Sequence, residues 1–154
     1  MGAGRELIFL DIDGVLNSQE FWARHVAAGG RGGLDGIDEL AVRRLNTLVA
    51  TSGARVIVSS YWRFYGVPTL QILLDQKGAS FLLAGHTTYR RGMSRGAEIA
   101  EFLNTYQTPV ASFVILDDDD DMGDLAGHLI QIDHRVGLTD ADVERALVML
   151  RGGG

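Results

Sequence analysis

Short apolar runs that stop abruptly at polar residues are the feature that most constrains the fold of this chain. Residues 7–10 are all apolar and are followed directly by Asp11, and residues 113–116 are followed in the same way by Asp117. Runs of this length and composition are typical of strands buried on both faces, as in a parallel sheet. Three further runs complete a predicted set of five strands, at residues 55–58, 81–83 and 129–132.

Stretches with helical spacing separate these runs. Apolar residues recur every three to four positions over residues 35–50, and Gly53 is well suited to end that helix. We expect further helices at about residues 69–76, after an N-cap at Ser94, and after an N-cap at Thr139. Alternating strands and helices predict an α/β fold: a Rossmann-like three-layer sandwich around a mostly parallel five-stranded sheet.

The chain length predicts a single domain covering residues 1–154. Residues 17–34 contain aromatic residues and glycine pairs, and we interpret them as a mobile flap with one short helix. Residues 151–154 are expected to be a frayed tail. Neither residues 17–34 nor residues 84–93 are long enough for a large cap domain, so the functional cleft should be open.

Composition excludes several classes of function. The chain contains no cysteine, so it has no disulfides and no thiolate metal sites. Its net charge of −6 disfavours non-specific binding of nucleic acid. No segment approaches the roughly 20 apolar residues that cross a membrane, and the N-terminal residues do not resemble a signal peptide. We therefore expect a cytoplasmic protein with no membrane association and no obligatory protein partner.

Polar side chains collect at the ends of three predicted strands. Asp11 and Asp13 follow the first strand, Ser59 follows the second, and Asp117 and Asp118 follow the fourth. Ligands of open α/β sheets bind outside the carboxyl ends of the strands, so these groups should share one edge. Several carboxylates this close remain ionised only if a cation compensates them. Hard oxygen ligands without cysteine or paired histidines favour Mg²⁺.

A carboxylate beside a carboxylate-bound metal suits phosphoryl transfer. One aspartate attacks phosphorus, and a second protonates the leaving oxygen and later activates water. Asp11 and Asp13 would share a face of a continuing strand because they lie two positions apart. Gly14 would permit a sharp turn that directs Asp13 back into the site.

Four segments together resemble the motifs of the haloacid dehalogenase-like (HAD) superfamily. Residues 9–17 resemble its first motif, and residues 56–59 resemble the second, a strand that ends in Ser or Thr. Arg95, which begins a predicted helix, occupies the place of the third-motif cation, and residues 114–118 resemble the acidic fourth motif. The four motifs occur in the family order and span almost the whole chain.

A finer resemblance concerns the residues around the second and fourth motifs. Residues 59–63 (SSYWR) and the five aspartates at residues 117–121 are similar to phosphatase-like domains linked with RNA repair proteins. This similarity is less specific than the four ordered motifs.

The superfamily resemblance implies a role for each acidic residue. Asp11 would be the nucleophile and a metal ligand, and Asp13 would be the general acid/base and give the metal its backbone carbonyl. Asp118, with or without Asp117, would complete the metal site. Asp121 could instead act on the metal through water.

The resemblance also implies which residues bind phosphate and substrate. Ser59 would hydrogen-bond a phosphoryl oxygen, and Arg95 would neutralise the nucleophile and the phosphate, although Arg90 or Arg91 could compete for that role. Three further residues are expected to contact substrate: Gly14, Ser60 and Arg63.

These expectations describe a Mg²⁺-dependent phosphatase acting on either a small phosphorylated metabolite or a phosphorylated nucleic-acid end. Two other classes stay open. A receiver-like signalling domain also clusters aspartates at strand ends, but it takes the phosphoryl group after a strand in the middle of the chain, where this sequence has Ser59 and Ala84. An inactive module that binds metal or phosphate without turnover would share every motif.

Overall fold

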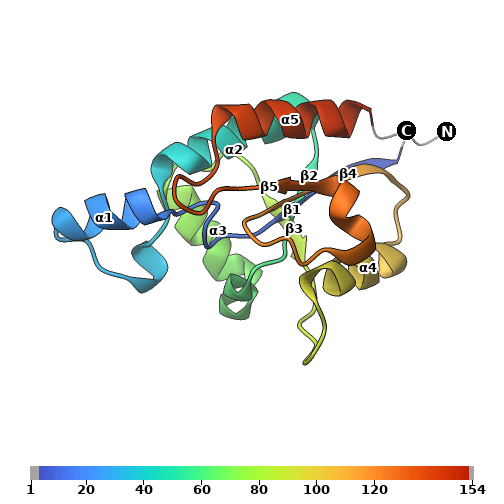
Figure 1. The fold of residues 1–154 in the computed structure, drawn as a ribbon, viewed down its shortest axis with the longest axis horizontal. Coiled ribbons are helices and arrows are strands. Elements are labelled where there is room, and N and C mark those ends of the chain that lie inside the picture. Colours follow the sequence, from blue (N-terminus) through green and yellow to red (C-terminus); the bar gives the residue numbers. More distant parts are fainter. Residues whose placement is uncertain (1–3, 153–154) are drawn as a thin grey trace.

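A five-stranded, all-parallel sheet runs through the middle of the molecule (Figure 1). The structure is a computed structural model and describes residues 4–152. The strand order is β3-β2-β1-β4-β5, which confirms the predicted Rossmann-like α/β sandwich. The strands are β1 (Arg5–Leu10), β2 (Arg55–Val58), β3 (Leu83–His86), β4 (Val110–Asp117) and β5 (Leu129–Gln131).

Residues 4–152 also form five α-helices and three short 3-10 helices, and all of them except α5 lie between strands in the chain. Figure 1 shows α2 and α5 together along one side of the sheet and α4 on the opposite side. No helix among residues 4–152 is long and apolar enough to cross a membrane. The α-helices are α1 (Gln19–Ala27), α2 (Glu39–Ser52), α3 (Val67–Gln76), α4 (Arg95–Thr105) and α5 (Asp140–Arg151). The 3-10 helices are η1 (Gly33–Asp35), η2 (Tyr61–Tyr65) and η3 (Gly123–His128).

The predicted helix caps are present in the structure. Gly53 ends α2 in the left-handed conformation, which an L-residue with a side chain rarely adopts. The Ser94 hydroxyl accepts a hydrogen bond from Ala97 N at the start of α4. Thr139 and Asp142 form a reciprocal capping box at the start of α5. These caps define the end of α2 and the starts of α4 and α5.

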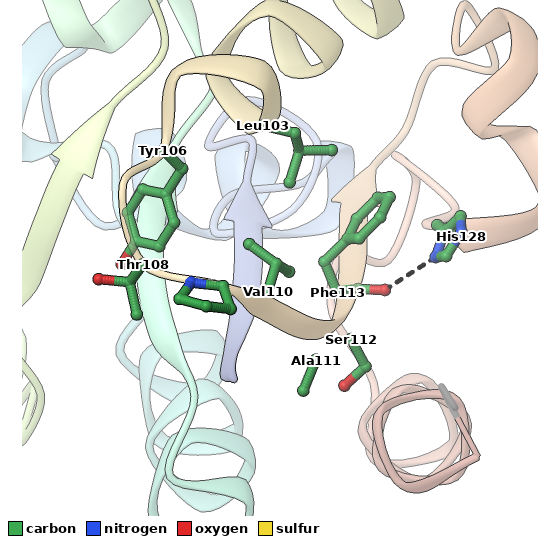
Figure 2. Close-up of a pocket in the computed structure, with 9 residues that line it drawn as sticks. Leu103, Tyr106, Thr108, Val110, Ala111, Ser112, Phe113 and His128 are labelled. Atoms are coloured by element: carbon green, nitrogen blue, oxygen red, sulfur yellow. Dashed lines mark hydrogen bonds between the residues drawn. The ribbon is translucent and has the colours of Figure 1, made fainter. Parts of the chain in front are cut away.

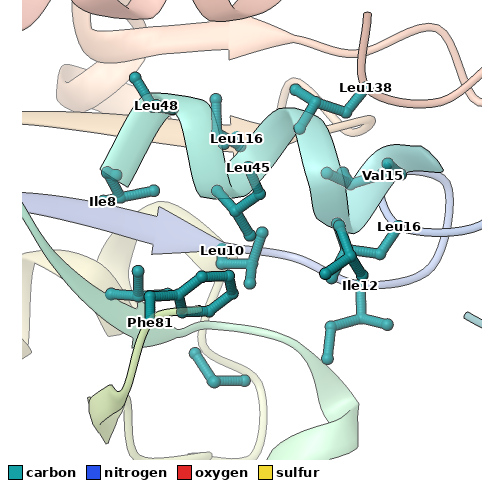
Figure 3. Packing of buried hydrophobic residues seen from close by; sticks show 14 of the residues in the cluster. Ile8, Leu10, Ile12, Val15, Leu16, Leu45, Leu48, Phe81, Leu116 and Leu138 are labelled. Carbon is teal, nitrogen blue, oxygen red and sulfur yellow. The ribbon is translucent and has the colours of Figure 1, made fainter. Parts of the chain in front are cut away.

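The larger of two hydrophobic clusters lies on the α2 and α5 side of the sheet. Ile8 and Leu10 of β1 point into it, and so does Leu116 of β4. Figure 3 shows these side chains close to Leu45 and Leu48 of α2. The cluster also contains buried residues of α3 and α5, so these helices share one core with α2.

The smaller cluster lies on the α4 side. The alternate strand residues Phe9, Ile57 and Ile115 pack there against Ile99 of α4. Successive strand side chains point to opposite faces, so a residue two positions after Phe9, Ile57 or Ile115 also faces α4. The polar residues that follow these strands therefore project toward the start of α4.

The third strand differs from its prediction. Residues 81–83 were expected to form it, but it runs from Leu83 to His86. The apolar signal came from Phe81, which is buried in the larger cluster before the strand begins, whereas Leu82 is exposed. Because β3 is an edge strand, its exposed positions do not need apolar residues. The predicted strand end at Ala84 is wrong.

The segment at residues 17–34 contains α1, whose N-cap is Ser18. No residue of α1 is fully buried, and the segment adds no large cap domain to the described residues. At the other end of the chain, α5 continues through Arg151, so that residue is helical. Residues 153–154 of the predicted tail lie outside the described part of the chain.

Candidate active site

Four polar residues form a row across the carboxyl edge of the sheet, one from each of four strands. Across the sheet, the row consists of Asp117, Asp11, Ser59 and Thr87. Each of these residues comes directly after a strand residue that is paired with its neighbour in the next strand. All four are buried. Backbone hydrogen bonds extend the sheet to this row: Asp11 N to Leu116 O at 3.0 Å, Ser59 N to Leu10 O at 2.9 Å, and Thr87 N to Val58 O at 2.9 Å.

Three carboxylates converge at this edge. Asp11, Asp117 and Asp118 each offer an oxygen, and these oxygens lie within 4.8 Å of one another. Burial raises the pKa of Asp11 to about 9, and the neighbouring charge of Asp117 adds to the rise. Burial also raises the pKa of Asp117 above its usual range. Carboxylates this buried ionise at neutral pH only if a cation lies beside them.

Arg95 supplies one cation to this cluster. Its Nη1 lies 2.7 Å from Asp117 Oδ2 and 3.4 Å from Asp11 Oδ1. Burial lowers the pKa of Arg95, but attraction to Asp11 and Asp117 outweighs burial and leaves the pKa raised. One guanidinium cannot balance three ionised carboxylates, so full ionisation of the cluster would need a further cation.

The start of α4 is held against the acidic loop that follows β4. Gly96 N donates a hydrogen bond to Asp121 O at 2.9 Å, and Arg95 N lies 3.4 Å from Asp121 Oδ2. A β-carbon at Gly96 would collide with the carbonyl of Met122. The absence of a side chain at Gly96 therefore lets the helix approach closely enough for Arg95 to reach Asp117.

The two arginines that competed with Arg95 in the sequence lie elsewhere. Arg90 and Arg91 are both exposed, and the Arg90 guanidinium pairs with Glu101 at 2.7 Å. Arg95 is the arginine that contacts Asp11. Asp121 is not one of the three converging carboxylates, and it binds the start of α4 instead.

The turn after Asp11 is held by Asn17, for which the sequence suggested no role. Asn17 Oδ1 accepts from Gly14 N at 3.0 Å, and Asn17 Nδ2 donates to Asp13 Oδ1 at 3.1 Å. Gly14 has a φ of 84°, and a β-carbon there would collide with the Asp118 carboxylate. Asp13 is exposed, so its carboxylate is accessible to water.

Two hydroxyls in the row have no hydrogen-bond partner among residues 4–152. Ser59 Oγ and Thr87 Oγ1 are both fully buried and unpaired. Buried hydroxyls in proteins are nearly always hydrogen-bonded. Two neighbouring hydroxyls without a partner at this edge of the sheet therefore suggest that a ligand supplies their hydrogen bonds. Thr87 was missed in the sequence because the third strand was placed too early. Its signal is the same as that of Ser59, a hydroxyl residue directly after a strand.

Ser60 and Arg63 follow Ser59 and make contacts within the chain. The Ser60 hydroxyl caps η2 by accepting from Trp62 N at 3.1 Å. Arg63 is buried, and its guanidinium donates to Ser60 O at 3.0 Å and to Glu98 Oε2 at 3.2 Å. Glu98, a buried acid one turn after Arg95 in α4, is a third residue that the sequence did not indicate, after Asn17 and Thr87. The Arg63 guanidinium is therefore bound by groups within the chain, Ser60 O and the Glu98 carboxylate.

A separate hollow of about 380 Å³ lies at the opposite end of β4, away from Asp117 (Figure 2). Val110 and Phe113 line it together with Tyr106, and His128 Nδ1 is 3.1 Å from the Phe113 carbonyl. Its lining contains no carboxylate, so it is distinct from the acidic edge.

A family model for the HAD domain in Swiss Army Knife RNA repair proteins matches residues 7–143. The chain belongs to this family. The match confirms both resemblances seen in the sequence, and no curated protein matches the chain. HAD domains are generally hydrolytic, so this member is a HAD-type hydrolase. The matched range includes every residue of the acidic edge described above.

HAD domains typically use Mg²⁺, and the donor set of this member fits that ion. Asp11, Asp117 and Asp118 provide hard carboxylate oxygens at one place, which is the chemistry that Mg²⁺ prefers.

Proposed function

We propose that the protein is a Mg²⁺-dependent phosphatase that hydrolyses phosphomonoesters through an aspartyl-phosphate on Asp11. The observation that carries the proposal is the convergence of Asp11, Asp117 and Asp118 around Arg95 at the carboxyl edge of the sheet. When bound by these carboxylates and by the Asp13 carbonyl, Mg²⁺ would neutralise charge on the phosphoryl oxygens.

Asp11 is the nucleophile in this proposal. A carboxylate oxygen of Asp11 forms a bond to phosphorus while the bond from phosphorus to the leaving oxygen breaks. Asp11 must be ionised to attack, and because burial raises its pKa to about 9, a neighbouring positive charge would favour the ionised form. Arg95, 3.4 Å from Asp11, provides part of that charge.

Asp13 is the general acid and base. It gives its proton to the leaving oxygen in the first step and takes a proton from water in the second. That water attacks phosphorus, breaks the bond to the Asp11 oxygen and releases inorganic phosphate. The exposure of Asp13 and its hydrogen bond to Asn17 are consistent with a carboxylate held at the mouth of the site.

Ser59 and Arg95 hold the phosphoryl group in place. The Ser59 hydroxyl, buried and unpaired, can donate to a phosphoryl oxygen. Arg95 can share its guanidinium between phosphate and the carboxylates. Gly14 contributes by bringing its backbone close to Asp118 without a side chain.

The substrate belongs to one of two classes, a small phosphorylated metabolite or a phosphorylated nucleic-acid end. The family takes its name from RNA repair proteins, which favours the second class. The short segment at residues 17–34 leaves the acidic edge without a large cap, and an open edge can admit the end of a polymer.

Hydrolysis of p-nitrophenyl phosphate tests the activity. The native protein should turn this substrate over with Mg²⁺ and stop when EDTA is added, and Asp11→Asn should be inactive. Asp75→Asn is the matched control, because Asp75 is an exposed aspartate of α3 outside the carboxylate cluster. Full activity of Asp11→Asn would refute the mechanism, whereas an inactive native protein that still binds Mg²⁺ would identify a binding module.

A further inference from the structure

Three exposed aromatic rings gather beside the acidic edge. Tyr61 and Phe64 belong to η2, and Tyr89 belongs to the segment between β3 and α4. The ring centroids of Phe64 and Tyr89 are 5.6 Å apart, and those of Tyr61 and Tyr89 are 6.3 Å apart. Their exposed fractions are 62% for Tyr61, 67% for Phe64 and 44% for Tyr89. We call this group the aromatic rim.

A buried cation holds the aromatic rim together. The Arg63 guanidinium carbon lies 5.5–5.7 Å from the centroids of all three rings. Arg63 itself is fixed by its ion pair with Glu98, whose carboxylate is 5% exposed. The buried pair therefore keeps the Arg63 guanidinium at a defined place close to the three rings.

The aromatic rim is continuous with the proposed phosphoryl site. The guanidinium carbon of Arg95 lies 5.7 Å from the Tyr61 ring centroid, and the same guanidinium reaches Asp11 and Asp117. A phosphoryl group on Asp11 would therefore have the Tyr61 ring just beyond Arg95. In a nucleotide one sugar separates the phosphate from the base, so a base could reach the rim while its phosphate sits at Asp11.

We propose that the aromatic rim stacks the nucleobase next to the phosphate that this protein removes. The proposal rests on the phosphatase function above and narrows its substrate to base-bearing phosphomonoesters. Exposed Tyr and Phe rings beside arginine are the usual stacking platform for unpaired bases. Three rings are far smaller than the roughly 800 Å² per partner of a stable protein interface, so a protein partner fits poorly.

A neighbouring aromatic residue provides the matched control. Tyr65 lies in the same 3-10 helix and is 48% exposed. Its ring packs edge-on against Trp62 at 5.7 Å, and Trp62 belongs to the core. Tyr65 thus matches Tyr89 in type and exposure, but its ring packs against Trp62 of the core.

The first test compares a sugar phosphate that has no base with two nucleotides that have one. Ribose 5-phosphate, 5′-AMP and 3′-AMP should be assayed with the native protein and with Phe64→Leu, Tyr89→Leu and Tyr65→Leu. We expect the native protein to prefer one nucleotide over ribose 5-phosphate by about tenfold in kcat/KM. Phe64→Leu and Tyr89→Leu should remove most of this preference through KM, and Tyr65→Leu should keep it. Phe64→Trp, which retains a flat ring, should restore it.

Two results would overturn the proposal while leaving the phosphatase function intact. One is equal kcat/KM for nucleotide and ribose 5-phosphate in the native protein. The other is an equal loss on both substrates in the rim variants, which would indicate a structural role for the rings.

A binding measurement keeps the proposal testable if no turnover is found. Calorimetric titration of Asp11→Asn with 5′-AMP, 3′-AMP and ribose 5-phosphate needs no catalysis. A nucleotide should bind about tenfold more tightly than ribose 5-phosphate, and Phe64→Leu in the same background should abolish the difference. Equal affinities would refute base stacking on the aromatic rim. Tighter binding of a nucleotide without hydrolysis by the native protein would refute only the phosphatase function.

Discussion

The two faces of the sheet are built from the same strands, but they carry different residues at the carboxyl ends of those strands. On the α2 and α5 side, the apolar rows of the strands continue past β1 into Ile12, which is also buried in the larger cluster. On the α4 side, the rows stop and are replaced by Asp11, Ser59, Thr87 and Asp117. The first face therefore stabilises the fold, and the second sacrifices part of that stability for a charged site.

The largest effect is expected from Asp11→Asn, measured with EDTA present, because it removes a carboxylate from the α4 side of the sheet. The variant should lose turnover and yet melt at a higher temperature than the native protein, by about 3–6 °C at pH 8. The reason is that Asn removes a carboxylate that burial and Asp117 disfavour. Thermal unfolding with EDTA measures the difference.

The pH dependence of this gain has a defined sign. The pKa of Asp11 is about 9 in the folded protein, against 3.8 for an ordinary aspartate. Between these values the folded state keeps a proton that the unfolded state has released, so the native protein loses stability as pH rises from about 4 to about 9. Asn does not titrate, so the advantage of the variant should grow over the same range. A constant difference from pH 5 to pH 8 would contradict this account.

Mg²⁺ sharpens the same experiment. An ion that binds only the folded state raises the melting temperature as its concentration increases. The native protein should gain stability with Mg²⁺, and Asp11→Asn should gain much less because one ligand is missing. Equal gains in both proteins would place the ion elsewhere.

The second prediction concerns the apolar face. Leu45→Ala in α2 removes a fully buried side chain from the larger cluster. It should lower the free energy of unfolding by about 2–5 kcal/mol, measured by urea denaturation. Phosphatase activity well below the melting temperature should stay near the native value, because no residue of the acidic edge is changed. A large loss of kcat in folded Leu45→Ala would show that the two faces are coupled.

The sequence was informative where the signal is local. The central strands β1 and β4 are apolar and end abruptly, so Asp11 and Asp117 could be placed at the sheet edge from the sequence. The edge strand β3 has no such composition, and Thr87 was missed with it. The pair of Arg63 and Glu98 was also missed, because the two residues are separated by 35 positions and only the fold brings them together.

The third-motif cation shows the same limit. Arg90, Arg91 and Arg95 were all candidates in the sequence. The choice depends on how closely α4 approaches the loop after β4, and that approach depends on Gly96 lying against the Met122 carbonyl. Such a tertiary contact leaves no periodic signal in the sequence.

The third prediction uses this contact. Gly96→Ala should push the start of α4 away from Met122 and draw Arg95 away from Asp11. Since a misplacement of about 1 Å can lower a rate by roughly a hundredfold, we expect a loss of kcat of about 10- to 100-fold. Ala97→Ser in the next position of α4 is the control, because it adds one atom to the same turn of the helix at a partly exposed position. An unchanged kcat in Gly96→Ala would contradict the proposal that the rate depends on the position of Arg95.

The smallest expected effect is that of Thr87→Val at the α4 face. Valine has nearly the shape of threonine but lacks the hydroxyl, and Thr87 Oγ1 is buried without a partner among the described residues. Removing an unpaired buried hydroxyl should leave the free energy of unfolding unchanged or raise it by up to about 1 kcal/mol. If a phosphoryl or leaving-group oxygen completes this hydroxyl, kcat/KM should fall by about 3- to 10-fold, which corresponds to one neutral hydrogen bond. Thr87→Ser should restore the rate because it keeps the hydroxyl. A stabilised Thr87→Val with full activity would remove Thr87 from the functional row and leave Ser59 as the hydroxyl that serves the site.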